Sequence, residues 1–187
     1  MRKAHARGFT LIELVTTLAV IGILIAVTVP TYRQMSRKNA VVNASNSFLT
    51  LLTLARSAAI ANNRNVIVCR TTSTTACSGG TTWDQGAMVY VDRNSNGSYD
   101  SGEELRIEVP VSTSATFATA SGTGFDISSS ITFRVDGSVC ASGAGCLESS
   151  FTVQASASDC QRVLKVNPMT GQVKTTVPAG STSCPNI

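Results

Sequence analysis

Six cysteines are the residues with the clearest capacity for chemistry in this 187-residue chain. None of them forms a Cys-x-x-Cys pair, which argues against a structural zinc site and against a dithiol redox site. They follow an apolar N-terminal segment, and an even number of cysteines beyond a membrane is typical of disulfides. Six cysteines allow 15 pairings. Joining sequence neighbours is the simplest scheme: Cys69–Cys77, Cys140–Cys146 and Cys160–Cys184.

A second set of side chains carries oxygen ligands at the spacing of an EF-hand calcium loop, D-x-[DN]-x-[DN]-G-x5-E. The set is Asp92, Asn94, Asn96, Gly97 and Glu103, with Asp100 at the ninth loop position. The flanks Met88–Val91 and Leu105–Val109 have strand composition rather than helical periodicity, and Asn-Gly favours a hairpin turn. We therefore expect a hairpin turn capped by its own side chains and no cofactor, with calcium binding as the alternative.

The N-terminal region contains a membrane-spanning segment. Residues 9–29 form an apolar run with one charge, Glu13, and as a helix this run spans roughly 30 Å, the thickness of a bilayer core. The basic flank, residues 1–8, favours a cytoplasmic N-terminus. The run is too long for a secretory signal peptide and reaches Val29-Pro30 without an Ala-x-Ala site. We expect a retained, single-pass anchor in the bacterial inner membrane with the remainder in the periplasm.

The string from Gly8 to Leu14, G-F-T-L-I-E-L, resembles the class III signal of type IV prepilins. The resemblance implies that a prepilin peptidase removes residues 1–8 by cutting after Gly8 and that Phe9 is then N-methylated. It also implies that Glu13 pairs with the N-terminal amine of a neighbouring subunit. A carboxylate in a membrane helix is costly, and a nearby ammonium offsets that cost. Pro30 should kink the helix.

Helical periodicity continues beyond Pro30, so we expect one helix from Phe9 to about Ala61, ended by Asn62-Asn63. Its first part, 9–29, would cross the membrane and its second, 30–62, would be an amphipathic spine. The stripe expected to face a sheet is Val41, Ala44, Phe48, Leu52, Ala55 and Ala59. The strands expected from β-branched and aromatic content are Asn65–Arg70, Gly86–Asp92, Glu104–Val109, Ile131–Asp136, Ser150–Ala155, Gln161–Asn167 and Gln172–Val177.

These elements predict an α+β domain in which a long helix packs on an antiparallel sheet, with Pro110–Ser130 as the longest connector. The head, residues 63–187, together with the end of the helix before it, resembles the GspH/FimT-type minor pilins and pseudopilins, which implies the type IV pilin fold. The matching motifs are Leu54–Ile60, Trp83–Gly86, Asp92–Gly97, Glu104–Arg106, Phe133–Gly137 and Gly171–Lys174. A Cys160–Cys184 bridge would tie the C-terminal tail to a strand and would be similar to the C-terminal disulfide loop of many type IV pilins.

Charge gives little indication of a partner. Removing Arg2, Lys3 and Arg7 with the leader leaves 12 basic and 11 acidic residues. The segment from Cys160 holds three basic residues and no acidic one, and FimT-like proteins are linked to DNA uptake through a C-terminal G-R-x-R pattern. In this chain the matching residues are Gly171-Gln172-Val173-Lys174, so glutamine replaces the first arginine and lysine replaces the second. Any DNA site would comprise Arg162, Lys165 and Lys174, and strand periodicity places the first two on opposite faces, so we expect weak, salt-sensitive binding.

The remaining chemistry is sparse. His5, the only histidine, lies in the leader, so a mature chain would lack a His-based triad and an HExxH zinc site. We therefore expect that the protein is not an enzyme and has no catalytic residue. The resemblance implies a minor pilin that primes type IV pilus assembly together with other minor and major pilins. A type II secretion minor pseudopilin, whose H subunits generally carry fewer cysteines, and a DNA receptor for transformation are the alternatives.

Overall fold

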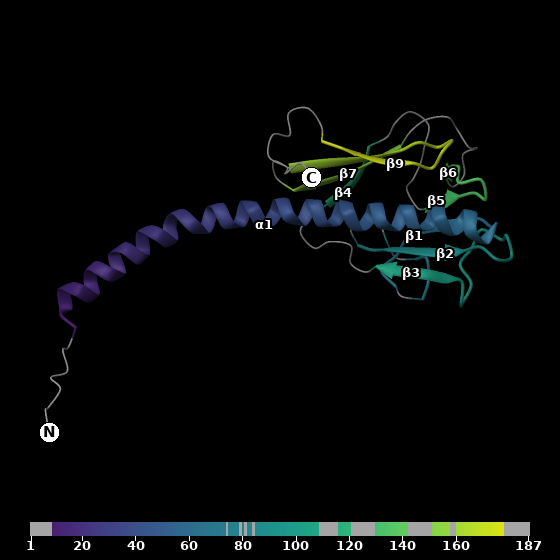
Figure 1. The fold of residues 1–187 in the computed structure, drawn as a ribbon. Helices are drawn as coiled ribbons and strands as arrows, with labels where there is room; N and C mark the ends of the chain where they lie inside the picture. The colour runs from purple at the N-terminus through teal and green to yellow at the C-terminus, as the bar shows by residue number, and fades with distance from the viewer. Residues whose placement is uncertain are drawn as a thin grey trace, which may run out of the picture. The chain divides into compact units, whose positions relative to one another are not determined.

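Among the residues that the computed structural model describes, one long helix is followed by nine strands (Figure 1). Helix α1 covers Leu11–Asn62, and the strands are β1 Val66–Arg70, β2 Ala87–Val91, β3 Glu104–Glu108, β4 Thr116–Ala120, β5 Ser130–Phe133, β6 Val139–Ala141, β7 Phe151–Ala157, β8 Cys160–Val166 and β9 Val173–Thr176. The structure describes residues 9–73, 75–78, 80, 82–83, 85–108, 116–120, 130–141, 151–157 and 160–177.

Helix α1 is uninterrupted through Pro30 and contributes to two compact units, Met1–Ser36 and Arg37–Ile187. The bend expected at Pro30 stays a prediction. The helix ends as its sequence predicts. Asn63 adopts a left-handed backbone with φ 49°, its N–H donates to the carbonyl of Ile60, and the N–H of Arg64 donates to that of Ala59. This pair of bonds is the Schellman arrangement, in which asparagine can replace glycine.

The second unit contains two antiparallel sheets with the strand orders β3-β2-β1-β5-β6 and β4-β7-β8-β9. The second half of α1 lies along both sheets (Figure 1). One core joins them, because buried side chains of α1, β1, β2, β5 and β8 form a single cluster. Every residue of the predicted helix stripe is buried in this cluster, and the Phe48 ring lies 5.2 Å from that of Trp83 and 5.6 Å from that of Phe117.

Two strands were missing from the sequence prediction. Strand β4 lies inside the segment 110–130 that was expected to be a connector, and it pairs with β7. The predicted strand Ile131–Asp136 stops at Phe133, because residues 134–138 form a turn in which Gly137 has φ 79° and the N–H of Arg134 donates to the carbonyl of Ser138. Strand β6 follows this turn and pairs with β5 as a hairpin.

Strands β1 and β2 are buried on both faces. Their inner face belongs to the main core, whereas a smaller cluster covers the outer face: Ile67, Cys69, Met88 and Tyr90, packed with Cys77, Tyr99 and Ile107. The outer face is therefore covered by the segment after β1 and by the β2–β3 connection. The segment after β1 contains Cys77, and the β2–β3 connection contains the Asp92–Glu103 loop.

Candidate functional site: the apolar helix and the head

The N-terminal half of α1 is an exposed apolar surface. The helix is long and apolar enough to cross a membrane, and none of its most apolar window is buried within the chain. Threonine hydroxyls in this half donate hydrogen bonds to backbone carbonyls one turn earlier in the helix: Thr16 to Glu13, Thr17 to Leu14 and Thr28 to Leu24. A bilayer offers no water to satisfy such groups, so this internal bonding suits a spanning helix.

Glu13 lies in the first turn of α1, where a carboxylate also meets the positive end of the helix dipole. Its backbone N–H lies 3.4 Å from Oγ1 of Thr10, which caps the helix. The spacing Thr10-x-x-Glu13 is that of a capping box, a signal that the sequence analysis did not use. The side chain of Glu13 has no partner among the described residues, so it is free to meet a group from another molecule. Gly8 lies outside the described residues.

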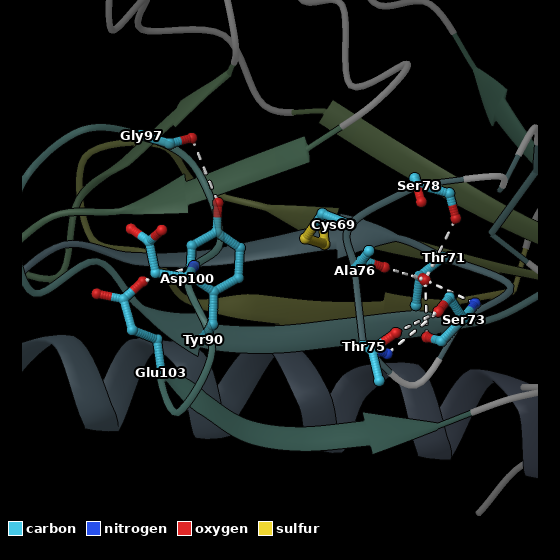
Figure 2. Close-up of a disulfide and its surroundings, with 11 residues drawn as sticks. Cys69, Thr71, Ser73, Thr75, Ala76, Ser78, Tyr90, Gly97, Asp100 and Glu103 are labelled. Atoms are coloured by element: carbon cyan, nitrogen blue, oxygen red, sulfur yellow. Dashed lines mark hydrogen bonds between the residues drawn. A yellow bond between two sulfur atoms is a disulfide. The ribbon is translucent and has the colours of Figure 1, made fainter.

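The structure contains the predicted Cys69–Cys77 disulfide, with the two Cα atoms 5.8 Å apart. It closes the segment after β1 over the outer face of the sheet (Figure 2). Buried Thr71 organises this segment, because its hydroxyl lies 2.6 Å from the carbonyl oxygen of Ala76 and accepts the N–H of Ser73 at 2.9 Å.

Two further cysteines, Cys140 and Cys160, are also disulfide-bonded. Their expected partners, Cys146 and Cys184, lie outside the described residues. The pairings Cys140–Cys146 and Cys160–Cys184 therefore stay predictions. A bridge at Cys160 would start from the first residue of β8, a position at which that side chain is fully buried in the core.

The loop between β2 and β3 is flanked by antiparallel strands, as predicted. Its carboxylates are occupied by backbone donors. Asp92 is buried and accepts the N–H groups of Asn96 and Gly97, each at 3.0 Å. Glu103 is buried too and accepts the N–H groups of Arg93 at 2.8 Å and of Asp100 at 3.2 Å. The loop is thus closed by its own capping side chains.

Other oxygens of the loop are engaged in the same way. Asp100 Oδ2 accepts the side-chain amides of Asn94 at 2.7 Å and Asn96 at 2.9 Å. Among the described residues no group of three His, Cys, Asp or Glu side chains is arranged to hold a metal. The nearby Tyr90 donates its hydroxyl to the carbonyl of Gly97 (Figure 2). Burial, followed by the negative charges of Asp92, Glu103 and Asp100, raises the pKa of Tyr90 to about 12.

We expect little response of this loop to calcium, because its two buried carboxylates already accept two backbone N–H groups each. Calorimetric titration of the full chain in detergent measures the response. A dissociation constant below about 100 µM, the range of sensor EF-hands, that is lost in Asp92→Ala would contradict the hairpin interpretation. Asp136→Ala, a carboxylate in the β5–β6 turn, is the matched control.

The three residues of the expected DNA site do not share one face. Arg162 is buried on β8, whereas Lys165 is exposed on the same strand. Lys165 lies directly opposite Lys174 of β9 in the strand register, so the structure brings only these two together. Like charges in directly opposed positions repel each other. Two neighbouring ammonium groups release few counterions, which is consistent with the weak binding expected.

Three of the sequence motifs meet at one point, where α1 contacts two turns. Arg56 donates its Nε–H to the carbonyl of Thr170 at 2.8 Å. A Cβ atom on Gly171 would lie 3.1 Å from Cδ of Arg56, and one on Gly137 would lie 3.4 Å from its Nε. The N–H of Val139 donates to the carbonyl of Pro168, which joins the two turns directly. Glycine at 137 and 171 therefore permits Arg56 to fasten the helix to both sheets.

Comparison with known proteins agrees with this architecture. The family model described as type II transport protein GspH matches residues 44–171. The chain belongs to the GspH family. The prokaryotic N-terminal methylation motif also matches, over residues 3–29. A comparison with curated proteins found no match.

Two solved structures resemble this GspH-family chain. The type IV minor pilin FimU of Pseudomonas aeruginosa is 16% identical with a TM-score of 0.51, covering 81% of this chain and 96% of that one. The minor pseudopilin EpsH from the type 2 secretion system of Vibrio cholerae is 12% identical with a TM-score of 0.47, covering 74% and 96%. The similarity to FimU supports the type IV pilin-like fold that the sequence predicts.

Proposed function

We propose that this GspH-family chain is a minor pilin that primes the assembly of a type IV pilus. The observation that carries the proposal is the exposed apolar half of α1 with Glu13 in its first turn. A helix of this kind is stable in a bilayer, and it can pass into a filament core only if its carboxylate finds a cation. The processed N-terminal amine of a neighbouring subunit would supply that cation, since its pKa lies near 8.

In this proposal residues 1–8 keep the N-terminus cytoplasmic until prepilin peptidase cuts after Gly8, and Phe9 becomes the methylated N-terminus. The anchor holds the chain in the inner membrane with the head in the periplasm. The head then meets neighbouring minor subunits while α1 joins the helical core. Disulfides at Cys69, Cys77, Cys140 and Cys160 suit a head that works outside the cytoplasm.

A minor pseudopilin of a type II secretion machine is the second candidate, favoured by the description of the family as a type II transport protein. The six cysteines favour the pilus, because type II secretion H subunits generally carry fewer. Both candidates require the same anchor and the same pairing of Glu13. They differ in the neighbours that the head contacts.

Co-purification of the full chain from envelope membranes separates the two. We expect other minor pilins of one pilus system to accompany the wild-type chain, and to be lost from the filament fraction when Glu13 is replaced. Recovery of secretion subunits in their place would support the pseudopilin role. A chain that co-purifies with neither group would contradict both candidates.

A further inference from the structure

A cavity of about 470 Å³ lies beside the junction of α1 with β9. We call it the Arg56 pocket; Thr53, Arg56 and Ser57 of α1 and residues 171–174 line it. It contains two cationic side chains, Arg56 and Lys174, and none of its described lining residues is acidic. Within the described part of the chain neither cation has an ion pair. A concave site whose described lining carries two cations and no acidic residue is suited to an anion.

The guanidinium in this pocket is held in a fixed orientation. Its Nε–H is bonded to the carbonyl of Thr170 at 2.8 Å, and the backbones of Gly137 and Gly171 pack against its shaft. This arrangement uses one donor of five, and within the described residues neither terminal nitrogen donates a hydrogen bond. A guanidinium that is already oriented loses little entropy when it binds a planar, forked acceptor. A carboxylate has that geometry.

We propose that the Arg56 pocket receives an aspartate or glutamate side chain from the head of another filament subunit. This inference rests on the proposed function, because it requires a neighbour in the filament. Duplex DNA is less suited to the pocket, since its affinity grows with the number of phosphates neutralised. Lys165, directly opposite Lys174, adds one exposed cation beside the site, whereas Arg162 on the same strand is buried.

Lys174 permits a test that does not disturb the fold. It is exposed, it makes no hydrogen bond or ion pair within the described residues, and it directly opposes Lys165. Lys174→Glu would replace a repulsive cross-strand pair with an attractive one, so the head should be at least as stable as before. Lys165→Gln removes the charge opposite Lys174 without giving Lys174 a new ionic partner, and it is the control on the same sheet face outside the pocket.

The first measurement uses the unaltered full chain in isolated filaments and a water-soluble carbodiimide. This reagent condenses a lysine amine with a carboxylate in contact, forming an amide with loss of water. Peptide mapping should recover Lys174 joined to an aspartate or glutamate of another subunit. The Lys174→Arg variant should enter filaments normally and lose this cross-link. Absence of a Lys174 cross-link in the wild type, or a cross-link at Lys165 alone, would overturn the proposal.

The second measurement is the amount of each variant in the filament fraction. Lys174→Glu should be reduced about tenfold, equivalent to roughly 1.4 kcal/mol of association free energy, while Lys165→Gln stays near wild type. Normal incorporation of Lys174→Glu would overturn only the pocket, whereas a wild-type chain that never enters filaments would overturn the proposed function as well. Duplex DNA binding by the full chain that Lys174→Glu abolishes, without a carboxylate cross-link, would assign the pocket to phosphate and overturn the protein partner.

Discussion

Glu13→Ala is expected to be processed and inserted into the membrane like the wild-type chain, and then to be missing from filaments. Removing a carboxylate from an apolar helix favours insertion, by up to about 2.5–3.5 kcal/mol at the bilayer centre and less near its surface. The same change removes the group that would pair with the N-terminal amine of a neighbour. Immunoblots of the membrane and sheared-filament fractions measure the two steps separately.

Two further variants identify the cause of the defect. Glu13→Gln keeps the shape of the side chain and removes its charge, so it should fail as Glu13→Ala does. Thr17→Ala, one turn further along α1, removes a hydroxyl whose one bond among the described residues is to the carbonyl of Leu14, and it should assemble normally. Incorporation of Glu13→Gln at the wild-type level would show that no ion pair forms at this position.

Gly171→Ala should destabilise the head more than substitution of any other described glycine. Its backbone has φ 62°, a region that costs other residues about 1–2 kcal/mol. In addition, a Cβ atom there would collide with the carbonyl oxygen of Gly137 and press on Arg56. We expect a loss of about 3 kcal/mol, which would lower the melting temperature of the full chain in detergent by roughly 6–12 °C.

Gly97→Ala is the control for this substitution. It has φ 73°, yet a Cβ atom there would meet nothing within 4 Å. Its melting temperature should fall by the backbone contribution alone, about 2–8 °C. Equal losses in the two variants would mean that the contact between the turns at 137 and 171 contributes nothing to stability.

Much of the fold could be predicted from the sequence because its signals are local. The apolar run, the three- and four-residue spacing of the helix stripe and the Asn62-Asn63 terminus each depend on a few neighbouring residues, and the structure contains the helix they predict. Strand β4 was missed because it pairs with β7, some 35 residues away in sequence. Nothing within the segment 110–130 indicates that partner.

Site residues, too, could be predicted from the sequence only where they lie close together in it. The disulfide Cys69–Cys77 joins sequence neighbours, and this one of the three predicted pairings is confirmed. The capping of the 92–103 loop was expected from its turn residues. The Arg56 pocket, by contrast, combines a helix with β9 and two turns that lie more than 75 residues beyond it. The sequence motifs marked these residues, but only the tertiary structure brings them together.

Intact mass of the chain recovered from sheared filaments tests the central claim most directly, namely that the chain is a processed subunit retained through its N-terminal helix. Prepilin cleavage removes residues 1–8 and leaves α1 whole, so the predicted mass is that of residues 9–187 with one methyl group added at Phe9. It should also be reduced by the hydrogens lost in three disulfides. A mature chain that begins near residue 30, or one that keeps its leader in the filament, would contradict the account.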